Sequence, residues 1–179
     1  MAEATTYIGN ATASGATTQT LTFTGIPSTY DDLLIMGQGH NNSSAGAMLY
    51  LDVNFNNDTS GNYWRSHIVT TGGSLWGSYI DSGLSAQIRI AAIGGTQNSD
   101  DTPAGFYMYI PRYKQAMYNT MWFWNAAMTN ATNWSQAVTS NVGSAFWGNS
   151  AAISEIDLKT LFGYFTAGSS YDLYGISNS

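Results

Sequence analysis

Residues 47–55 alternate strictly between two kinds of side chain, and this pattern places the tightest limit on the fold. The apolar kind fills every second position: Ala47, Leu49, Leu51, Val53 and Phe55. A period of two is typical of a β-strand with one buried face, because successive side chains of a strand point to opposite sides. The polar run 56–61, Asn-Asn-Asp-Thr-Ser-Gly, follows directly and is typical of a turn. The chain therefore contains at least one strand-and-turn unit.

Units of the same kind recur along most of the chain. Gly, Asn and Ser clusters separate most of the segments, and helical periodicity is weak nearly everywhere. Residues 153–162 fit neither template well, and we interpret them as containing a strand. The expected strands are 19–24, 32–37, 47–55, 63–70, 87–93, 104–113, 119–128, 137–147, 153–158 and 170–176. Many short strands with frequent turns predict an all-β protein, a jelly-roll-like β-sandwich in a single domain.

The length of 179 residues suits one domain, and no repeat or shift in composition marks a second. We assign residues 1–18 to a polar N-terminal arm or a first strand, and residues 19–179 to the β-sandwich domain. The chain closes on Tyr171–Ile176, a strand-like pattern close to the last residue. Terminal residues usually fray unless packing holds them, so we expect this segment to be the last strand, pairing near the first.

Charge is scarce in this chain, and its sign excludes one class of partner. Charged residues make up 9% of the sequence, and five Lys and Arg against eleven Asp and Glu give a net charge of −6. Nucleic-acid binding needs clustered cations that neutralise phosphates, so we exclude DNA and RNA as direct ligands. Aromatic residues reach 14%, which argues against disorder in spite of the many small polar residues.

Other classes of site and segment are missing from the sequence. It has no cysteine, which excludes disulfides, thiolate metal sites and cysteine nucleophiles. No basic start with an apolar stretch marks a signal peptide, and no apolar run approaches the roughly 20 residues of a membrane-spanning helix. We therefore expect no membrane partner, and a role outside a cell would need release by lysis or by a dedicated machine.

The most apolar run is Thr120–Asn125, and it is bulky on both sides. As a strand it places Met121 and Phe123 on one face and Trp122 and Trp124 on the other. Such a strand is usually central in a sheet and covered on both faces. The second cover would be a loop of the same chain or a neighbouring subunit. We expect a symmetric homo-oligomer, with a trimer favoured and with Trp122 or Trp124 at its interface.

Residues 52–61 place oxygen-bearing side chains at alternating positions, as a calcium-binding loop does. The pattern departs from that motif at two positions. Asn57 stands where the EF-hand needs glycine, and Tyr63 stands where it needs glutamate. A polar strand edge that runs into an Asx-rich turn explains the same residues, so we predict no metal site and no cofactor.

Candidate catalytic residues are few and lack a motif. His40 and His67 are the two histidines, and no Gly-x-Ser-x-Gly nucleophile motif accompanies them. The acidic candidates, which lie beside turn residues or share a strand face, are Asp31, Asp32, Asp100, Asp101, Glu155 and Asp157. Glycoside hydrolysis needs two carboxylates held across a sugar, and the sequence establishes no such pair. We predict that the protein is not an enzyme.

Aromatic rings beside small polar residues are stronger candidates for a functional surface. Flat rings next to amide side chains suit sugar recognition by stacking and hydrogen bonding, and Tyr and Trp are also enriched at subunit interfaces. A third interpretation is that the rings cap the ends of the β-core. The candidate binding residues are Trp64, Trp76, Tyr79, Trp122, Trp124, Trp134 and Trp147.

Four stretches of the chain resemble a known group of proteins. They are Phe23–Ile35 (FTGIPSTYDDLLI), Tyr109–Tyr113 (YIPRY), Asn149–Ile156 (NSAAISEI) and Tyr171–Ile176 (YDLYGI). Their order and spacing are similar to those of small β-rich virion proteins of tailed phages, which are common in phages of marine and freshwater bacteria, cyanophages included. The resemblance spans residues 5–176.

This resemblance implies a place in the virion, on the outer surface of the bacteriophage particle. The first hypothesis is a structural protein, a capsid decoration (cement or knob) protein that binds the major capsid protein, with residues 8–20 as an attachment arm. The alternative is the head module of a tail fibre or spike, which binds host-surface glycan through its tryptophans. The chain departs from the group in its Trp-rich strand at 122–124 and in a longer stretch after Ile156, and no site residues carry over.

Overall fold

The structure is a computed structural model of the chain, and it describes residues 4–15, 17–43, 49–71, 74–95, 103–115, 119–128 and 138–178. Within these residues the secondary structure consists of twelve β-strands. This part of the chain contains no helix that is long and apolar enough to cross a membrane. In chain order the strands are β1 (Ala4–Thr12), β2 (Thr20–Thr24), β3 (Asp32–Asn41), β4 (Leu49–Phe55), β5 (Tyr63–Thr71), β6 (Ser74–Ser85), β7 (Ile88–Gly95), β8 (Ala104–Ile110), β9 (Asn119–Met128), β10 (Val138–Trp147), β11 (Glu155–Thr160) and β12 (Ser170–Ser177).

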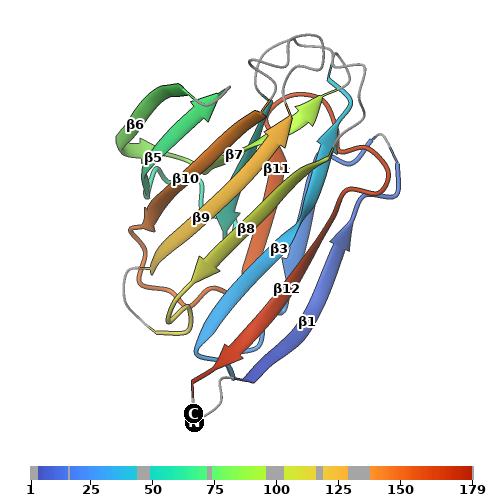
Figure 1. The fold of residues 1–179 in the computed structure, drawn as a ribbon. Helices are drawn as coiled ribbons and strands as arrows, with labels where there is room; N and C mark the ends of the chain where they lie inside the picture. The colour runs from blue at the N-terminus through green and yellow to red at the C-terminus, as the bar shows by residue number, and fades with distance from the viewer. Residues whose placement is uncertain are drawn as a thin grey trace.

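The strands form two antiparallel sheets that pack face to face, which confirms the all-β, single-domain β-sandwich expected from the sequence (Figure 1). The larger sheet has the order β1–β12–β3–β8–β9–β10–β5–β6, and the smaller has the order β2–β11–β4–β7. A short parallel pairing joins the two sheets at one corner. It connects His40 and Asn41 of β3 with Gly94 and Gly95 of β7.

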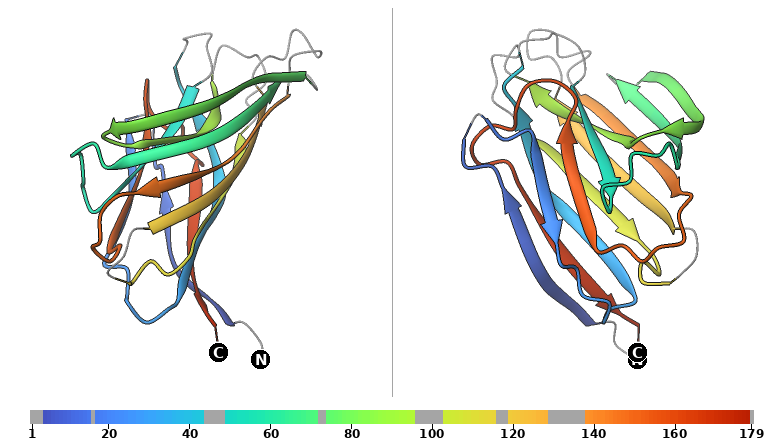
Figure 2. Two further views of the ribbon diagram at one scale, coloured as in Figure 1. Left: turned by 90° about the vertical axis from the view of Figure 1, so that its left-hand side faces the viewer. Right: turned by 180° about the vertical axis from the view of Figure 1, so that it is seen from behind.

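The larger sheet curls around one edge of the smaller one. β5 and β6 bend away from the rest of the larger sheet, toward β7 (Figure 2). Arg65 of β5 donates a hydrogen bond from its guanidinium group to the backbone carbonyl of Arg89 in β7. The larger sheet therefore has an inner face that holds the smaller sheet, and an outer face on the opposite side.

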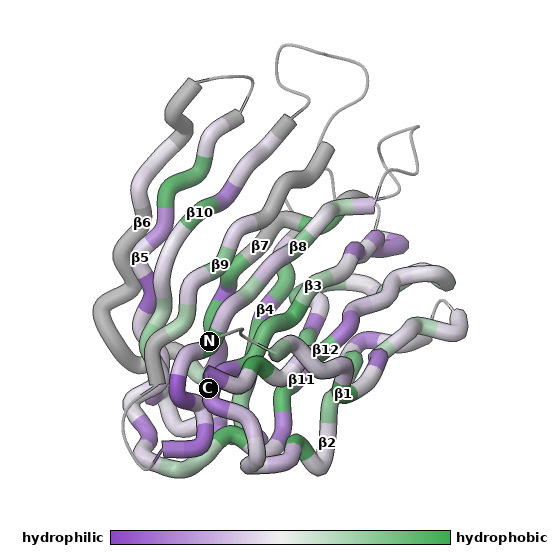
Figure 3. The backbone as a smooth tube through the Cα atoms, turned by 60° about the horizontal axis from the view of Figure 1, so that its bottom comes forward, coloured by the Kyte–Doolittle hydropathy of each residue, from purple (hydrophilic) through white to green (hydrophobic). Residues whose placement is uncertain are grey.

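The core lies between the two sheets and is built from alternate residues of each strand. In β4 the inward residues Leu51, Val53 and Phe55 are fully buried, as the alternation predicted. Phe106 and Met108 of β8 meet them from the larger sheet and are buried as well. Hydrophobic segments, drawn in green, gather in the middle of the sandwich in Figure 3. Removing apolar surface from water contributes roughly 25 cal/mol per Å², so this layer is the main stabilising element of the fold.

β12 lies between β1 and β3, which explains why a strand runs almost to the last residue. Asp31 and Asp32 hold the end of the chain. The backbone N–H of Asn178 donates to Oδ2 of Asp31 (2.7 Å), and its side-chain amide donates to Oδ2 of Asp32 (2.9 Å). The hydrogen bond from Asn178 and the ammonium of Lys114 hold the pKa of Asp31 below its usual value. These two carboxylates therefore have a structural role.

The sequence pattern did not predict β6, and its irregular pairing with β5 explains why. The register shifts between Tyr63 and Arg65 and again between Val69 and Thr70. Each shift interrupts the period of two on which a strand prediction rests. Residues 153–162, which fitted neither template, contain the strand β11.

Candidate functional site

Five adjacent strands of the larger sheet direct large apolar side chains outward. These strands are β3, β8, β9, β10 and β5, and Figure 1 looks onto their outer side. Inner positions such as Met121 and Phe123 of β9 fill the core, so strand alternation sends the residues between them outward. We call the outward set the aromatic face. It comprises Leu34, Met36, Trp64, Ile68, Tyr107, Tyr109, Trp122, Trp124, Val142 and Phe146.

Strand pairing arranges the aromatic face in rows across the sheet. One row crosses four strands and consists of Tyr107, Trp124, Val142 and Ile68. Met36 of β3 extends this row, because it is the partner of Tyr107. Side chains at directly paired positions lie about 5 Å apart at their Cβ atoms. The row therefore forms a continuous apolar band.

A second row runs beside the first, and the size of its side chains changes from one end to the other. It begins with the large residues Tyr109 of β8 and Trp122 of β9, and it continues with Ser144 of β10 and Ser66 of β5. A third level carries Phe146 opposite Trp64, whose ring centroids are 5.3 Å apart. The small serines thus lie between two levels of larger side chains.

The aromatic face is open to solvent in the single chain. Trp122 is 66% exposed and Trp124 is 48% exposed, and Val142 in the next strand is 52% exposed. β9 is central in the sheet, as the sequence predicted, but the described part of the chain covers only the face that carries Met121 and Phe123. Monomeric proteins rarely leave contiguous apolar patches of more than a few hundred Å² exposed. A face of this kind therefore suits contact with another molecule.

Charge is nearly absent from this side of the sheet. In the larger sheet, from β1 across β12, β3, β8, β9 and β10 to β5, the described outward positions include no lysine or arginine. Asp32 is buried there, and it accepts hydrogen bonds from the Tyr109 hydroxyl and from the backbone N–H of Arg112. Asp172 lies at the β12 side and accepts a hydrogen bond from Asn10 (2.7 Å). The face therefore lacks the charge that would attract an oppositely charged partner.

The candidate binding residues from the sequence fall into four groups. Trp64, Trp122 and Trp124 lie on the aromatic face and come from two strands that are not neighbours, β5 and β9. Trp76 and Tyr79 belong to β6, whose backbone is described while these two side chains are not. Trp134 lies outside the described residues. The remaining candidate, Trp147, is in the core.

For Trp147, the position in the structure matches the interpretation of a ring that caps the core. It is fully buried, and its ring packs on those of Phe55 (5.5 Å between centroids) and Tyr63 (6.4 Å, stacked). Its indole N–H donates to Oδ2 of Asp58. The inward position follows from its place in β10, where Ala145 also points into the core. Trp147 caps one end of the core and takes no part in an exposed surface.

The sequence patterns missed seven of the ten residues of the aromatic face. Tyr107 and Tyr109 alternate with the buried residues Phe106 and Met108 in β8, so this strand is bulky on both sides, as β9 is. The criterion used for β9 was the presence of large side chains on both faces of the strand. Applied to β8 as well, the same criterion identifies these two tyrosines. Ile68 gives no such signal, because its membership depends on the pairing of β5 with β10.

The two histidines take structural positions. Ser169 bonds to the backbone of His40: its hydroxyl donates to the carbonyl and accepts from the N–H, both at 3.1 Å. The ring Nδ1 of His40 lies 3.2 Å from the hydroxyl of Thr166. His67 is buried on the inner side of β5, against the ring of Phe123. The hydroxyl of Ser169 therefore holds the backbone of His40.

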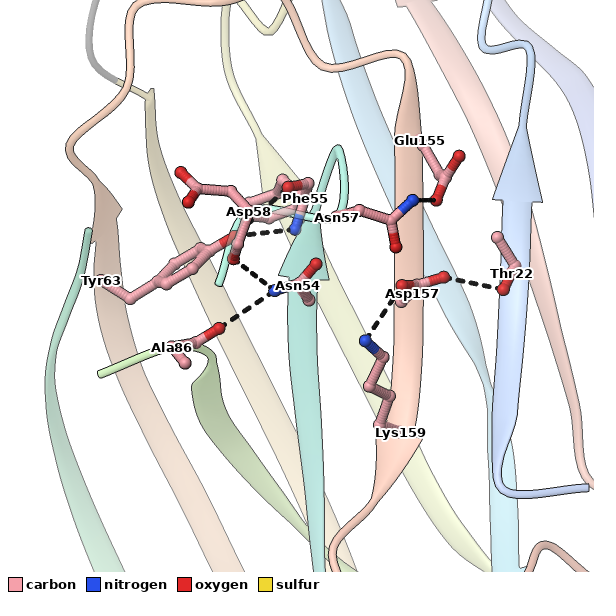
Figure 4. A network of polar contacts seen from close by, with 10 residues as sticks. All are labelled: Thr22, Asn54, Phe55, Asn57, Asp58, Tyr63, Ala86, Glu155, Asp157 and Lys159. Atoms are coloured by element: carbon pink, nitrogen blue, oxygen red, sulfur yellow. Dashed lines mark hydrogen bonds and ion pairs between the residues drawn. The ribbon is translucent and has the colours of Figure 1, made fainter. Parts of the chain in front are cut away.

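The outer face of the smaller sheet carries paired charges, in contrast to the aromatic face. Asp157 of β11 accepts from Thr22 (2.7 Å) and lies 3.1 Å from the ammonium of Lys159, as Figure 4 shows. Glu155, two residues earlier on the same strand face, accepts from the side chain of Asn57. Both carboxylates therefore bind side chains of the same sheet or of its turns, as is common for polar residues on the surface of a sheet.

Asp52 lies on the same outer face of the smaller sheet and is fully buried by its neighbours. Arg89 lies 3.1 Å from its Oδ1, and the amide of Gln87 donates to its Oδ2. The guanidinium of Arg89 also lies over the ring of Tyr50, 4.7 Å from its centroid. Burial raises the pKa of Asp52 in spite of the charge of Arg89.

The polar run that resembled a calcium loop is a hydrogen-bonded turn between β4 and β5. Asn56 and Asn57 have positive φ (49° and 54°), a conformation that asparagine tolerates well. The Asp58 carboxylate accepts from the side chains of Asn62, Trp147 and Asn149 and from the backbone of Ser60. These N–H groups occupy the carboxylate oxygens that a cation would need. In Figure 4 the backbone carbonyl of Asp58 also accepts from Asn54.

A second exposed aromatic feature lies in the loop between β11 and β12. Phe162 and Tyr164 are 56% and 43% exposed, with Gly163 between them at φ +69°. Amide side chains fix this loop: Asn41 donates to the Phe162 carbonyl (2.6 Å), and Asn42 accepts from the Tyr164 N–H (2.8 Å). The two rings are therefore presented on a fixed backbone. The sequence patterns assigned no binding role to Phe162 or Tyr164.

No family model matches this chain, and neither the curated proteins nor the solved structures contain a significant match to it.

Proposed function

We propose that this protein is a non-catalytic assembly protein that docks through its aromatic face. The observation that carries this proposal is the uncharged apolar band across β3, β8, β9, β10 and β5. Trp, Tyr and Met are enriched at protein interfaces, and Trp and Tyr are among the residue types that dominate binding energy where they are fully desolvated. A face of five strands spaced about 4.8 Å apart and three outward levels about 6.7 Å apart has a flat footprint on the order of 500 Å². That is the scale of a specific interface, in which each partner buries roughly 800 Å² of accessible surface.

We further propose a place for it in a bacteriophage virion, as a capsid decoration protein on the outer shell. The resemblance of residues 5–176 to small β-rich virion proteins supports this placement, and a compact sandwich of low charge suits it. The partner in this proposal is the major capsid protein, and no cofactor, nucleic acid or membrane is required. Binding of a decoration protein to the shell stabilises the shell by mass action.

The copy number per particle tests the virion placement. Particles of the virus that encodes this chain would be purified and analysed by quantitative mass spectrometry against the major capsid protein. Hundreds of copies per particle are expected for a decoration protein. A handful of copies would place the protein in the tail, and its absence from particles would overturn the placement altogether.

A second candidate function has one observation in its favour. Phe162 and Tyr164 stand exposed on a loop that Asn41 and Asn42 fix in place, and rings beside amides suit stacking on a sugar. The protein would then be the head module of a tail fibre or spike that binds host-surface glycan. Binding to isolated host polysaccharide that is lost in Phe162→Ala and kept in Trp122→Ala would support this function. Hydrolysis of that polysaccharide would contradict the non-catalytic role.

A further inference from the structure

We propose that the occupant of the aromatic face is a second copy of this chain, related by a two-fold axis that runs along the boundary between β9 and β10. This inference rests on the proposed docking role of the face and names its partner. A two-fold axis makes an interface self-complementary, because each contact occurs twice. The proposal therefore requires that one half of the aromatic face fit the other half. The strand register shows whether it does.

The two halves of the aromatic face differ in side-chain size. On the β9 side of the boundary, Trp122 and Tyr109 project from their row, and Trp122 is the most exposed large apolar residue among those described. On the β10 side, the same row continues as Ser144 and Ser66. A pair of large residues thus adjoins a pair of small residues at the same level of the sheet.

The short side chains of Ser144 and Ser66 lie between two pairs of larger side chains. On one side of them lie Phe146 and Trp64, whose rings are in contact at 5.3 Å between centroids. On the other side lie Val142 and Ile68, about half exposed. Outward residues on one strand are about 6.7 Å apart along it, so the Cα atoms of the two flanking pairs lie about 13 Å apart, with the serine between them. That spacing suits an inserted aromatic side chain.

The proposed axis brings the large half of each copy onto the small half of the other. An axis parallel to the strands, in the plane of contact, places β9 of one copy over β10 of the other at the same level. Trp122 then lies opposite Ser144 of the second copy, and Tyr109 lies opposite Ser66. In the neighbouring row the same operation places Tyr107 opposite Ile68. In the row of Trp122, the two large residues of β9 and β8 each meet a serine of the other copy, and the symmetry makes this match mutual.

The charge distribution favours this occupant over a charged one. The chain carries a net charge of −6, but the acidic and basic side chains that the structure describes lie mainly on the smaller sheet and in the turns. Two copies that meet through the aromatic face keep those charges apart. A basic partner would find few carboxylates on this face, and an acidic partner would find no lysine or arginine among its described residues. An uncharged, apolar surface of matching shape is what the face can recognise.

Sedimentation velocity over a wide range of protein concentration tests the dimer. We expect a monomer–dimer equilibrium whose dissociation constant rises at least about tenfold in Trp122→Ala, as for the truncation of a central aromatic residue. Ser144→Glu places a carboxylate opposite that ring and should abolish the dimer. Phe162→Ala is the matched control, because it removes a ring that is also more than half exposed but lies outside the face, and it should leave the equilibrium unchanged. A monomer at all concentrations, a trimer, or a dimer that is insensitive to both face variants would overturn the proposal.

Engineered cysteines test the position of the axis. The chain has no native cysteine, so Tyr107→Cys and Ile68→Cys can be made separately in an otherwise thiol-free protein. Both side chains are exposed, and neither position is needed for the core. Under mild oxidation a mixture of the two variants should form a disulfide-linked dimer, while each variant alone should remain unlinked. Equal cross-linking in each variant alone would contradict the proposed register.

The two proposals fail separately. A protein that forms this dimer but is absent from virus particles would refute the virion placement and leave the dimer intact. A protein that is abundant in particles but monomeric in sedimentation, without the mixed disulfide, would refute the dimer and leave the aromatic face free for the capsid.

Discussion

Trp147 donates its indole N–H to Oδ2 of Asp58 over 2.9 Å, and this bond ties the end of β10 to the turn after β4. The two strands belong to different sheets, so the contact closes one end of the sandwich. The ring of Trp147 also packs between Phe55 and Tyr63, which lie on either side of that turn. One side chain therefore combines core packing with a hydrogen bond to a charged group.

Replacing Trp147 with Phe should lower the free energy of unfolding by about 3 kcal/mol. The change removes a hydrogen bond to a carboxylate, worth roughly 1.5–3 kcal/mol, and part of a fully buried ring. Urea denaturation followed by circular dichroism measures the effect. Asp58→Asn and the double variant complete a cycle, and strictly additive losses would show that the two side chains are not coupled.

The stability that Asp58 contributes should disappear in acid. Burial acts to raise the pKa of this carboxyl, but hydrogen bonds from Asn62, Ser60, Trp147 and Asn149 outweigh it and hold the pKa well below the ordinary value of 3.8. A carboxyl group whose pKa is lower in the folded state stabilises the fold fully above its unfolded pKa, and it loses that contribution as the pH falls from there through the lower, folded pKa. Unfolding free energies of wild type and Asp58→Asn should therefore differ most near neutral pH, and the difference should shrink progressively as the pH falls below 3.8 toward the lower, folded pKa. A constant difference across this range would refute the role of the charge.

Asp52 should behave in the opposite way. Burial raises its pKa, so its charged form is less stable in the folded chain than in the unfolded chain. When folding raises the pKa of a carboxyl group, the contribution of that group to the free energy of unfolding falls as the pH increases from 3.8 through the folded pKa. Asp52→Asn keeps an acceptor for Arg89, which is partly exposed and stays solvated. We expect equal or higher stability than wild type at neutral pH, measured by urea denaturation, and a large loss there would contradict the argument.

The fold could be predicted from the sequence because its signals are local. Alternation within a strand and Asx-rich turns are written in consecutive residues, as in β4 and the turn at Asn56 and Asn57. The aromatic face could not be predicted as a whole, because it depends on which strands become neighbours. Pairing of β5 with β10 sets Trp64 beside Phe146, more than 80 residues later in the chain. Local patterns also failed to show that Trp64 lies on the outer face while Trp147 lies in the core, because both residues adjoin an aromatic residue and a polar turn.

Glycine at position 37 should be required for the place of β12. A Cβ atom at Gly37 would lie 2.3 Å from the backbone oxygen of Ser170 and 2.6 Å from the Cα of Tyr171. Backbone atoms cannot yield as a flexible side chain can, so Gly37→Ala should cost about 3 kcal/mol of stability, at the upper end of typical overpacking. Gly105→Ala is the matched control, because it lies in the adjacent strand β8 and a Cβ there meets nothing within 4 Å. Thermal unfolding should separate the two variants, and equal behaviour would refute the packing argument.

The two kinds of tryptophan should respond differently to truncation in the isolated chain. Trp122 is 66% exposed, so Trp122→Ala should change the free energy of unfolding by less than about 0.5 kcal/mol in dilute solution, as most surface substitutions do. Trp147 is fully buried, and Trp147→Ala should cost about 3–5 kcal/mol at any concentration. Urea denaturation at low and high protein concentration checks both values. A cost for Trp122→Ala that grows with concentration would show that its ring is buried by association, whereas a large cost at every concentration would mean that the rest of the chain covers it.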